Sequence, residues 1–371
     1  MSGNWNVPIE QLEVSAFTVP ASSPESDGTL EWTATTIVIV RARAAGLVGL
    51  GYTYADTAAA VLIDRVLKKL VLDGNAVSAQ ATWIAMVRAI RNLGRPGICS
   101  AAIAAVDNAF WDLKARLLHV PLVTLLGQVR NAIPAYGSGG FTSYAIEELQ
   151  SQLKGWVSEG MRAVKMKIGT HAEEDAGRVR AVRDAIGPNV ELFVDANGAY
   201  SRKQALGQAA RFRDLGVTWF EEPVSSDDLE GLRLLRDRAP VGMEIAAGEY
   251  GYDVIYFRRM LEAGAADVLQ ADATRCAGIT GFLQADALCQ AFGVPLSAHT
   301  APSLHAHLCC AAIAARNVEY FYDHVRIEQM FFDGAAKAED GLLRPDLSRC
   351  GFGLELKSRD VEKYRVYGVP T

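Results

Sequence analysis

Three acidic residues each end a short apolar segment of the sequence: Asp195, Glu221 and Glu249. Their neighbours are small or acidic, in the strings Val-Asp-Ala-Asn, Phe-Glu-Glu-Pro and Ala-Gly-Glu-Tyr. Three carboxylates directed at one small volume would repel one another, and they would not all stay ionised without a cation. Hard oxygen ligands on a rigid frame suit Mg²⁺, which keeps open positions for substrate oxygens. The three residues therefore predict a magnesium site rather than three separate solvated acids.

Groups that can act as bases flank these acids in the sequence. Lys165 and Lys167 are two apart on one apolar segment, so both side chains point to the same face of a strand. Neighbouring ammonium groups and burial both lower a lysine pKa, which would make such a lysine usable as a base. His299 and Asp272 end two later segments, and a carboxylate fixes a histidine tautomer and raises its basicity. Two bases around a metal suit removal of a proton α to a carboxylate, because the metal stabilises the enediolate that forms.

Strands and helices in a regular order must hold these residues. From residue 131 onward, short apolar segments end in polar residues at intervals of 20 to 28 residues, and helical segments such as 204–215 and 278–291 fill the gaps. This repeat predicts parallel strands buried on both faces, beginning with 133–138 and closing into a barrel. The carboxyl ends of barrel strands meet at one mouth, so the polar residues should meet there. The segments expected as the seven further strands are 164–169, 192–197, 218–223, 244–249, 268–272, 295–299 and 318–321.

The region before the barrel is expected to be mixed α+β. Residues 36–41 are expected to form a strand, and 20–28 a loop rich in proline, serine and glycine. Residues 59–72 and 101–118 have the patterns of helices, the second with an alanine-rich face that allows close packing.

Composition excludes several classes of protein. The 371 residues are half hydrophobic and carry a net charge of −6, so we expect no nucleic-acid partner. No apolar stretch approaches the roughly 20 residues that span a membrane, no secretory signal is visible, and no G-x-G-x-x-G follows a strand. The six cysteines have no zinc or redox spacing. We therefore expect a cytoplasmic protein without membrane contact.

The motifs together resemble those of the enolase superfamily, and within it the mandelate racemase subgroup. The resemblance implies an α/β fold: a modified TIM barrel, (β/α)₇β, with an α+β capping domain formed by the N-terminal region and the C-terminal tail. The expected parts are a cap over residues 1–130, a catalytic barrel over 131–325, and a C-terminal segment over 326–371 that completes the cap. The residues that carry it are Lys165-Met-Lys167, Asp195-Ala-Asn197, Phe220-Glu-Glu-Pro223, Gly248-Glu249, Asp272, Ser297-Ala-His299, Val318-Glu319 and the helix 105–114.

The resemblance also implies roles. Asp195, Glu221 and Glu249 would bind one Mg²⁺, and Lys167 and the His299–Asp272 pair would be the acid/base groups. Glu319 would hydrogen-bond the substrate carboxylate and Lys165 would make a second contact with it. Asp272 stands where the muconate lactonizing subgroup has a lysine, which argues against that subgroup. A small-molecule carboxylate is the implied partner, and homo-oligomers are usual in such families.

Other residues receive weaker assignments. Asn197 is a candidate metal-shell or substrate contact, and Glu222 is expected to face away from the metal. Trp32 and Tyr54 resemble capping-loop residues that set specificity, with ordinary domain packing as the equal alternative. His305 and His307 are not expected to bind metal, because residues two apart do not share a helical face. For His324, a loop hydrogen bond is favoured over a place at the mouth.

Three functions are compatible with these residues. Mg²⁺-dependent dehydration of an acid sugar, through an enediolate, is the leading interpretation. Racemisation or epimerisation of a 2-hydroxy acid would use the same site without a leaving group. A non-catalytic sugar-acid binding protein would lack a metal ligand or a base, whereas this sequence contains every one.

Overall fold

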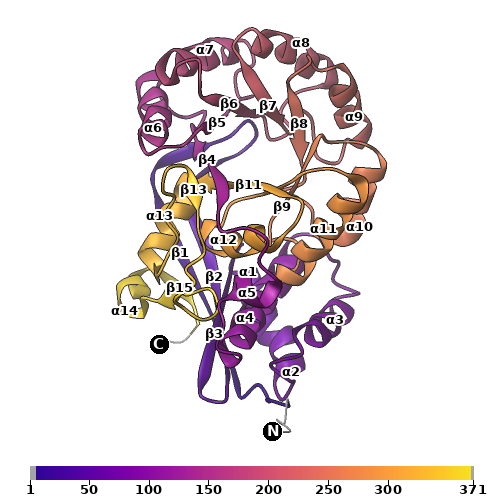
Figure 1. The fold of residues 1–371 in the computed structure, drawn as a ribbon, viewed down its shortest axis with the longest axis vertical. Coiled ribbons are helices and arrows are strands. Elements are labelled where there is room, and N and C mark those ends of the chain that lie inside the picture. The colour runs from indigo at the N-terminus through magenta and orange to yellow at the C-terminus, as the bar shows by residue number, and fades with distance from the viewer. Residues whose placement is uncertain (1–5, 369–371) are drawn as a thin grey trace.

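Parallel strands in the second part of the chain close into a barrel (Figure 1). The computed structural model of the protein describes residues 6–368. β11 pairs in parallel with β4, which closes the ring. Because side chains alternate along a strand, Lys165 and Lys167 point inward while Val164 and Met166 pack among the helices. The barrel strands are β4 (Ile133–Gly139), β5 (Ala163–Lys167), β6 (Glu191–Asp195), β7 (Val217–Glu221), β8 (Glu244–Ala247), β9 (Val268–Ala271), β10 (Leu296–Ala298) and β11 (Ala315–Phe321).

Helices connect these strands and cover the outside of the barrel (Figure 1). Each crossover returns the chain to the start of the next parallel strand, as parallel pairing requires. After β11 the chain enters α13 (Tyr322–Phe331) directly. The connecting helices are α6 (Ile146–Ser158), α7 (Asp175–Ile186), α8 (Arg202–Arg213), α9 (Leu229–Arg238), α10 (Val254–Glu262), α11 (Gly278–Phe292) and α12 (Pro302–Ala311).

An antiparallel sheet of order β15-β1-β2-β3 forms the core of the cap. Its strands are β1 (Gln11–Ser26), β2 (Glu31–Ala44), β3 (Leu47–Tyr54) and β15 (Arg365–Tyr367). The expectation of a loop over residues 20–28 is wrong for most of that segment, because β1 continues to Ser26 and pairs with the start of β2. Pro20 is tolerated there because β15 pairs with β1 near Ala16 and Phe17, which leaves the Pro20 side as an edge next to a register irregularity.

The predicted helices of the cap are confirmed. Residues 58–71 are helical without a break, as α1 (Ala58–Leu62), a π-helical turn (Ile63–Leu67) and α2 (Lys68–Val71). They are followed by α3 (Ala79–Ala89), α4 (Ile98–Leu117) and α5 (Leu122–Leu126). The alanine-rich face of α4 packs closely on β3. The approach is so close that a Cβ atom added to Gly51 would lie 2.2 Å from the carbonyl oxygen of Ala105.

The C-terminal residues return to both parts of the fold. β15 pairs with β1 of the cap, and β13 (Leu342–Leu343) pairs antiparallel with β4 of the barrel. Figure 1 shows these last elements beside the strands of the N-terminal region. The remaining elements are β12 (Phe332–Asp333), β14 (Glu355–Leu356), α14 (Ser358–Val361) and a 3₁₀ turn (Glu362–Tyr364). The predicted fold class, a modified TIM barrel with an α+β cap, is confirmed. Within residues 6–368, no helix is long and apolar enough to cross a membrane.

Candidate active site

The three acidic residues meet at the carboxyl ends of their strands. Lys167 is in register with Asp195, and Asp195 is in register with Glu221. Asp195, Glu221 and Glu249 each offer a carboxylate oxygen within 4.8 Å of the others, and all three residues are buried. A buried group of three carboxylate oxygens at this spacing fits the donor preference of Mg²⁺. The donor set therefore fits the cofactor that the sequence predicts.

Both lysines lie against these carboxylates. The Lys165 Nζ atom is 2.5 Å from Glu221 Oε1 and 2.9 Å from Glu319 Oε1, and Lys167 Nζ is 2.5 Å from Asp195 Oδ2. Burial alone would lower the pKa of each lysine, but the facing carboxylates outweigh burial and raise both pKa values above the ordinary range. The expectation that the lysine pair has lowered pKa values is therefore wrong for this arrangement. The reason is that carboxylates on neighbouring strands balance the positive charges of the two lysines.

His299 forms the predicted pair with Asp272 on the other side of the ring. His299 Nδ1 is 2.8 Å from Asp272 Oδ2, and His299 Nε2 is 3.3 Å from Glu249 Oε2. Burial would raise the pKa of Asp272, but the hydrogen bond and charge of His299 hold it below its usual range. The backbone N–H of Thr274 also donates to Asp272 Oδ1, at 2.6 Å. This carboxylate can orient the imidazole so that Nε2 faces the metal-binding acids.

Glu319 lies between the two flanks. Its Oε1 accepts a hydrogen bond from Ser138 Oγ at 2.6 Å in addition to its contact with Lys165. Burial would raise the pKa of Glu319, but Lys165 and His299 lower it below the ordinary value. Glu319 Oε2 is buried and has no hydrogen-bond partner among the described residues. That oxygen is available to a ligand in the cavity above.

Several residues that follow the catalytic strand ends have left-handed backbone conformations. Asn197, Glu222, Thr300 and Ala301 have φ values of 45°, 38°, 49° and 42°. Positive φ is costly for residues other than glycine and tends to cluster at functional sites. Glu222 is fully buried, and burial and the charge of Glu249 raise its pKa. Among the described residues, Glu222 is neither in the group of three carboxylates nor in the lining of the cavity above it.

A cavity of about 400 Å³ opens above these groups. It brings together the predicted residues Lys167, Asn197, Glu249, His299 and Glu319 with Trp32 and Tyr54 of the cap. Lys165, Asp195, Glu221 and Asp272 lie buried beneath it.

His324 also lines this cavity, on α13. Its ring stacks on Tyr54 with centroids 3.5 Å apart. In the described part of the chain, its Nδ1 atom has no hydrogen-bond partner. The preference for a loop hydrogen bond is therefore wrong, and the alternative place at the mouth is the one observed.

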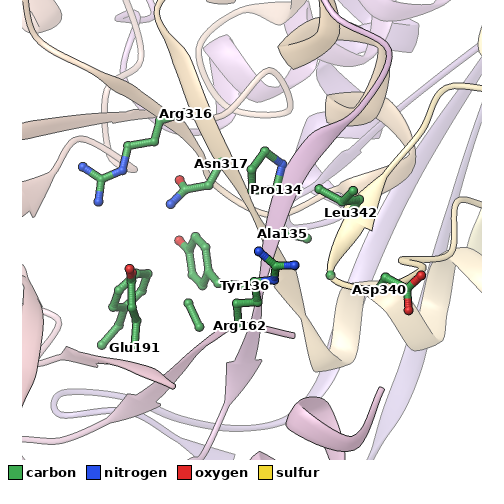
Figure 2. Close-up of a pocket in the computed structure, with 12 residues that line it drawn as sticks. Pro134, Ala135, Tyr136, Arg162, Glu191, Arg316, Asn317, Asp340 and Leu342 are labelled. Carbon is green, nitrogen blue, oxygen red and sulfur yellow. The ribbon is translucent and has the colours of Figure 1, made fainter. Parts of the chain in front are cut away.

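A second cavity, of about 320 Å³, lies at the opposite end of the barrel (Figure 2). Tyr136, Arg162, Glu191 and Asn317, which belong to strand starts or lie next to them, surround it. The guanidinium of Arg316 is held by Glu244, at 2.8 and 2.6 Å. None of the predicted catalytic or metal-binding residues is among the described residues that line it. The predicted site residues and this second cavity therefore lie at opposite ends of the barrel.

Both histidines of α12 have structural partners. His305 accepts a hydrogen bond from the Ala273 N–H at 3.0 Å and is 2.6 Å from the Thr300 carbonyl oxygen. His307 lies 3.1 Å from the Phe352 carbonyl oxygen. These contacts agree with the expectation that neither binds metal.

Sequence reasoning missed Arg275 and Ser138 as members of the site. Arg275 Nη1 lies 3.2 Å from Glu249 Oε1, and Ser138 is the hydrogen-bond donor to Glu319. Arg275 stands three residues after Asp272 and Ser138 ends the first strand segment, so their positions next to strand ends were an available signal.

Family comparisons agree with this fold and site. Residues 14–127 match the N-terminal domain of the mandelate racemase/muconate lactonizing enzyme family, and residues 148–361 match the family described as enolase C-terminal domain-like. The chain belongs to the mandelate racemase/muconate lactonizing enzyme family of the enolase superfamily. The resemblance predicted from the motifs is confirmed.

Curated relatives cover most of the chain. Arabinonate dehydratase of Saccharolobus solfataricus is 31% identical over 333 residues, which is 86% of this chain and 88% of the relative. The 3,6-anhydro-alpha-L-galactonate cycloisomerase of Streptomyces coelicolor is 30% identical and covers 81% of this chain and 84% of its own. L-talarate/galactarate dehydratase of Salmonella typhimurium is 29% identical over 95% of this chain and 90% of its own. The chain is an enzyme of the lyase type, the class to which the dehydratases among these relatives belong.

Solved structures agree as well. A mandelate racemase/muconate lactonizing enzyme-like protein from Rubrobacter xylanophilus is 52% identical with a TM-score of 0.95, covering 97% of this chain and 100% of that chain. A Streptomyces coelicolor racemase with bound magnesium has a TM-score of 0.91 at 28% identity, with 96% and 100% coverage. The Salmonella dehydratase liganded with Mg and L-lyxarohydroxamate has a TM-score of 0.90 at 26% identity, with 100% and 95% coverage. These ions and the acidic triad confirm the predicted Mg²⁺ cofactor.

Proposed function

We propose that the enzyme dehydrates a sugar acid to the 2-keto-3-deoxy acid. The observation that carries the proposal is the pair of acid/base groups on two flanks of one magnesium site. Lys167 ends β5 and His299 follows β10, across the ring from each other in strand order, with Asp195, Glu221 and Glu249 between them. Dehydratases of sugar acids among the relatives support the same class of reaction.

The first step is removal of the proton α to the substrate carboxylate, by His299 or by Lys167; Lys167 can accept this proton only after its ammonium group, held against Asp195, has released one of its own. When bound, Mg²⁺ stabilises the negative charge that gathers on the carboxylate oxygens of the substrate as this proton leaves. Lys165, held by Glu221 and Glu319, supplies a fixed positive charge beneath the same position. For Glu319 to hydrogen-bond the substrate carboxylate, its Oε2, which has no partner among the described residues, must carry a proton when the substrate is bound.

The second step is loss of the β-hydroxyl group as water. As imidazolium, His299 protonates the departing hydroxyl, since its Nδ1 is held by Asp272 and leaves Nε2 for the substrate side. The cap closes the mouth with Trp32 and Tyr54, which limits access of bulk water to the reacting carbon.

Racemisation or epimerisation is the second candidate. It uses Lys167 and His299 on opposite faces of the same carbon and needs no leaving group. The magnesium-containing Streptomyces coelicolor racemase, whose fold superimposes on this chain, favours keeping it. Non-catalytic binding of a sugar acid is the weakest candidate, because the described site holds every metal ligand and both bases.

One experiment separates these candidates. The Mg²⁺-loaded protein is incubated with a library of acid sugars in D₂O, and products are followed by NMR. A 2-keto-3-deoxy product is expected. Deuterium gained at the α-carbon with inverted configuration and no keto product would establish the racemase instead, and absence of both reactions would leave binding.

We further propose that the cap ends near residue 130, that the barrel ends near residue 325, and that the enzyme works as a homo-oligomer in the cytoplasm.

A further inference from the structure

Above the catalytic groups, the cavity has a wall of rings from distant parts of the chain. Tyr54 of β3 and His324 of α13 stack with their planes 14° apart, and Trp32 of β2 lines the same cavity. The Phe321 ring meets the His324 ring edge-to-face, with the two ring centroids 5.3 Å apart. We call Trp32, Tyr54 and His324 the tail wall, because a substrate whose carboxylate reaches the metal-binding acids directs its other end toward them.

The tail wall contains polar atoms without partners. Tyr54 Oη and His324 Nδ1 are buried, and neither has a hydrogen-bond partner in the part of the chain that the structure describes. Buried polar atoms are nearly always hydrogen-bonded in native proteins, to protein, water or ligand. By contrast, the Trp32 Nε1 atom is satisfied, since it donates to Glu25 Oε2 at 2.8 Å.

Both side chains of the stack are electrically neutral in this position. Burial, and then the charge of His299, hold the pKa of His324 well below its usual value. Burial raises the pKa of Tyr54 well above its usual value. A neutral imidazole has one donor and one acceptor, and a phenol can do either. This is the hydrogen-bonding pattern that recognises an alcohol.

The basic side chains that line the cavity already face carboxylates. Lys167 lies against Asp195, Arg275 lies 3.2 Å from Glu249, and His299 pairs with Asp272. Two further acids, Asp27 and Asp56, line the cavity, and among residues 6–368 neither forms an ion pair. A second carboxylate on the substrate would thus be desolvated near like charges without a cation of its own.

We propose that the tail wall selects sugar acids with a single carboxylate: aldonic acids, whose far end is an alcohol that hydrogen-bonds to Tyr54 Oη and His324, rather than aldaric acids, whose far end is a second carboxylate. The rings of Trp32 and Tyr54 provide apolar area for the C–H groups of the sugar chain. This inference rests on the proposed function and adds the substrate class to it.

Matched pairs of acids test the proposal by binding. D-gluconate with D-glucarate, and D-galactonate with galactarate, differ at the last carbon alone. Calorimetry on the Mg²⁺-loaded double variant Lys167→Met/His299→Asn measures affinity without turnover. In the pair that binds more tightly, the aldonate is expected to bind at least about tenfold more tightly than its aldarate. Equal or tighter binding of the aldarate, or no binding of any member, would overturn the proposal.

Variants of the wall test the residues. Tyr54→Phe and His324→Phe keep the stacked rings and remove the polar atoms. Each is expected to lower kcat/KM for the best aldonate about tenfold, mainly through KM. A three-carbon hydroxy acid, which lacks the far hydroxyl, should react equally with wild type and variants. Tyr256→Phe, which removes a hydroxyl bonded to the Ser226 carbonyl outside the cavity, is the matched control.

The outcomes separate this proposal from the dehydration itself. Absence of keto product with an aldonate preference in binding would reject dehydration and keep the tail wall. If aldarates gave keto product as fast as aldonates, dehydration would be kept and the role of the tail wall would be rejected. An equal loss with the long and the short acid would mean that the wall is structural. The wild-type preference between matched acids remains decisive if a wall variant fails to fold.

Discussion

The tail wall and the groups proposed to act at the strand ends adjoin one cavity but are built in opposite ways. The latter groups, here called the catalytic layer, are Lys165, Lys167, Asp195, Glu221, Glu249, Asp272, His299 and Glu319. In the layer, at the strand ends, the lysines and His299 contact carboxylates at distances of 2.5 to 3.4 Å. In the wall, Tyr54 and His324 are neutral and leave buried polar atoms without partners among the described residues. The layer therefore holds its charges in place before a substrate arrives, whereas the wall is completed by the substrate.

The largest effect on turnover is expected from removing the metal ion from the catalytic layer. Chelation should lower turnover of the preferred acid at least about 10³-fold, because the charge that develops on the substrate loses its main stabilisation. Added Mg²⁺ should restore the rate in wild type, and Asp195→Asn should need far more Mg²⁺ or stay inactive. Initial rates against Mg²⁺ concentration, with exposed Asp237→Asn as control, measure this. Wild-type magnesium affinity in Asp195→Asn would contradict the assigned ligand set.

An effect of similar or smaller size is expected from removing either base. Lys167→Met and His299→Asn should each lower kcat about 10²- to 10⁴-fold, the usual range for an acid/base group. Exchange of the α-proton with D₂O then divides their roles. The variant that still exchanges this proton without forming product has lost the acid, and the other has lost the base. If both variants turned over at the wild-type rate, the proton transfers would have to be assigned elsewhere.

The two regions also differed in how far the sequence predicted them. The layer was predictable because its polar residues stand at or near the carboxyl ends of strands, and these ends meet at one mouth of a barrel. The wall was predicted only in part. The resemblance named Trp32 and Tyr54, with domain packing as the equal alternative, but for His324, whose ring stacks on Tyr54 from far along the chain, a loop hydrogen bond was preferred. The lysine pKa values were misjudged for a related reason, since carboxylates of other strands outweigh burial. Residues 20–26 form a strand because β2 pairs with them, which their own composition does not reveal.

Substitution of Asp112, which hydrogen-bonds several segments of the cap, should lower stability without changing KM. This buried carboxylate accepts hydrogen bonds from the Leu50 N–H at 2.7 Å, the Phe352 N–H at 2.6 Å and Arg116 Nε at 2.8 Å. Asp112→Ala leaves these donors unsatisfied and is expected to lower the free energy of unfolding by about 3–5 kcal/mol. Urea denaturation measures this change.

The matched control for Asp112 is the exposed Asp237→Ala, expected to change the free energy of unfolding by less than about 1 kcal/mol. The folded Asp112→Ala enzyme should keep the wild-type KM, because Asp112 does not line the cavity. A raised KM at full folding would show that the cap position, and with it the tail wall, depends on this carboxylate.

The smallest effect concerns Glu328 of α13, which joins the cap to the barrel because it accepts hydrogen bonds from Tyr52 of β3 and from the Ser303 N–H of α12, at 2.7 and 2.9 Å. Burial raises its pKa from 4.5 to about 7, despite these bonds. Between those values the unfolded chain releases the proton and the folded protein keeps it. The free energy of unfolding therefore falls as pH rises through this interval, by up to about 3 kcal/mol from this group.

Glu328→Gln removes that titration; its single amide oxygen can accept from the Ser303 N–H, and its NH₂ group can donate to the Tyr52 hydroxyl. Relative to wild type, the variant should gain about 1–3 kcal/mol of unfolding free energy when pH rises from about 5 to about 8. The comparison must be a difference between the two proteins, because burial also raises the pKa of Glu25 and of Asp107 to about 7. Denaturation curves that shift in parallel for both proteins would show that Glu328 is ionised in the folded state. The junction between cap and barrel would then hold a buried charge. Charged groups would in that case not be restricted to the catalytic layer.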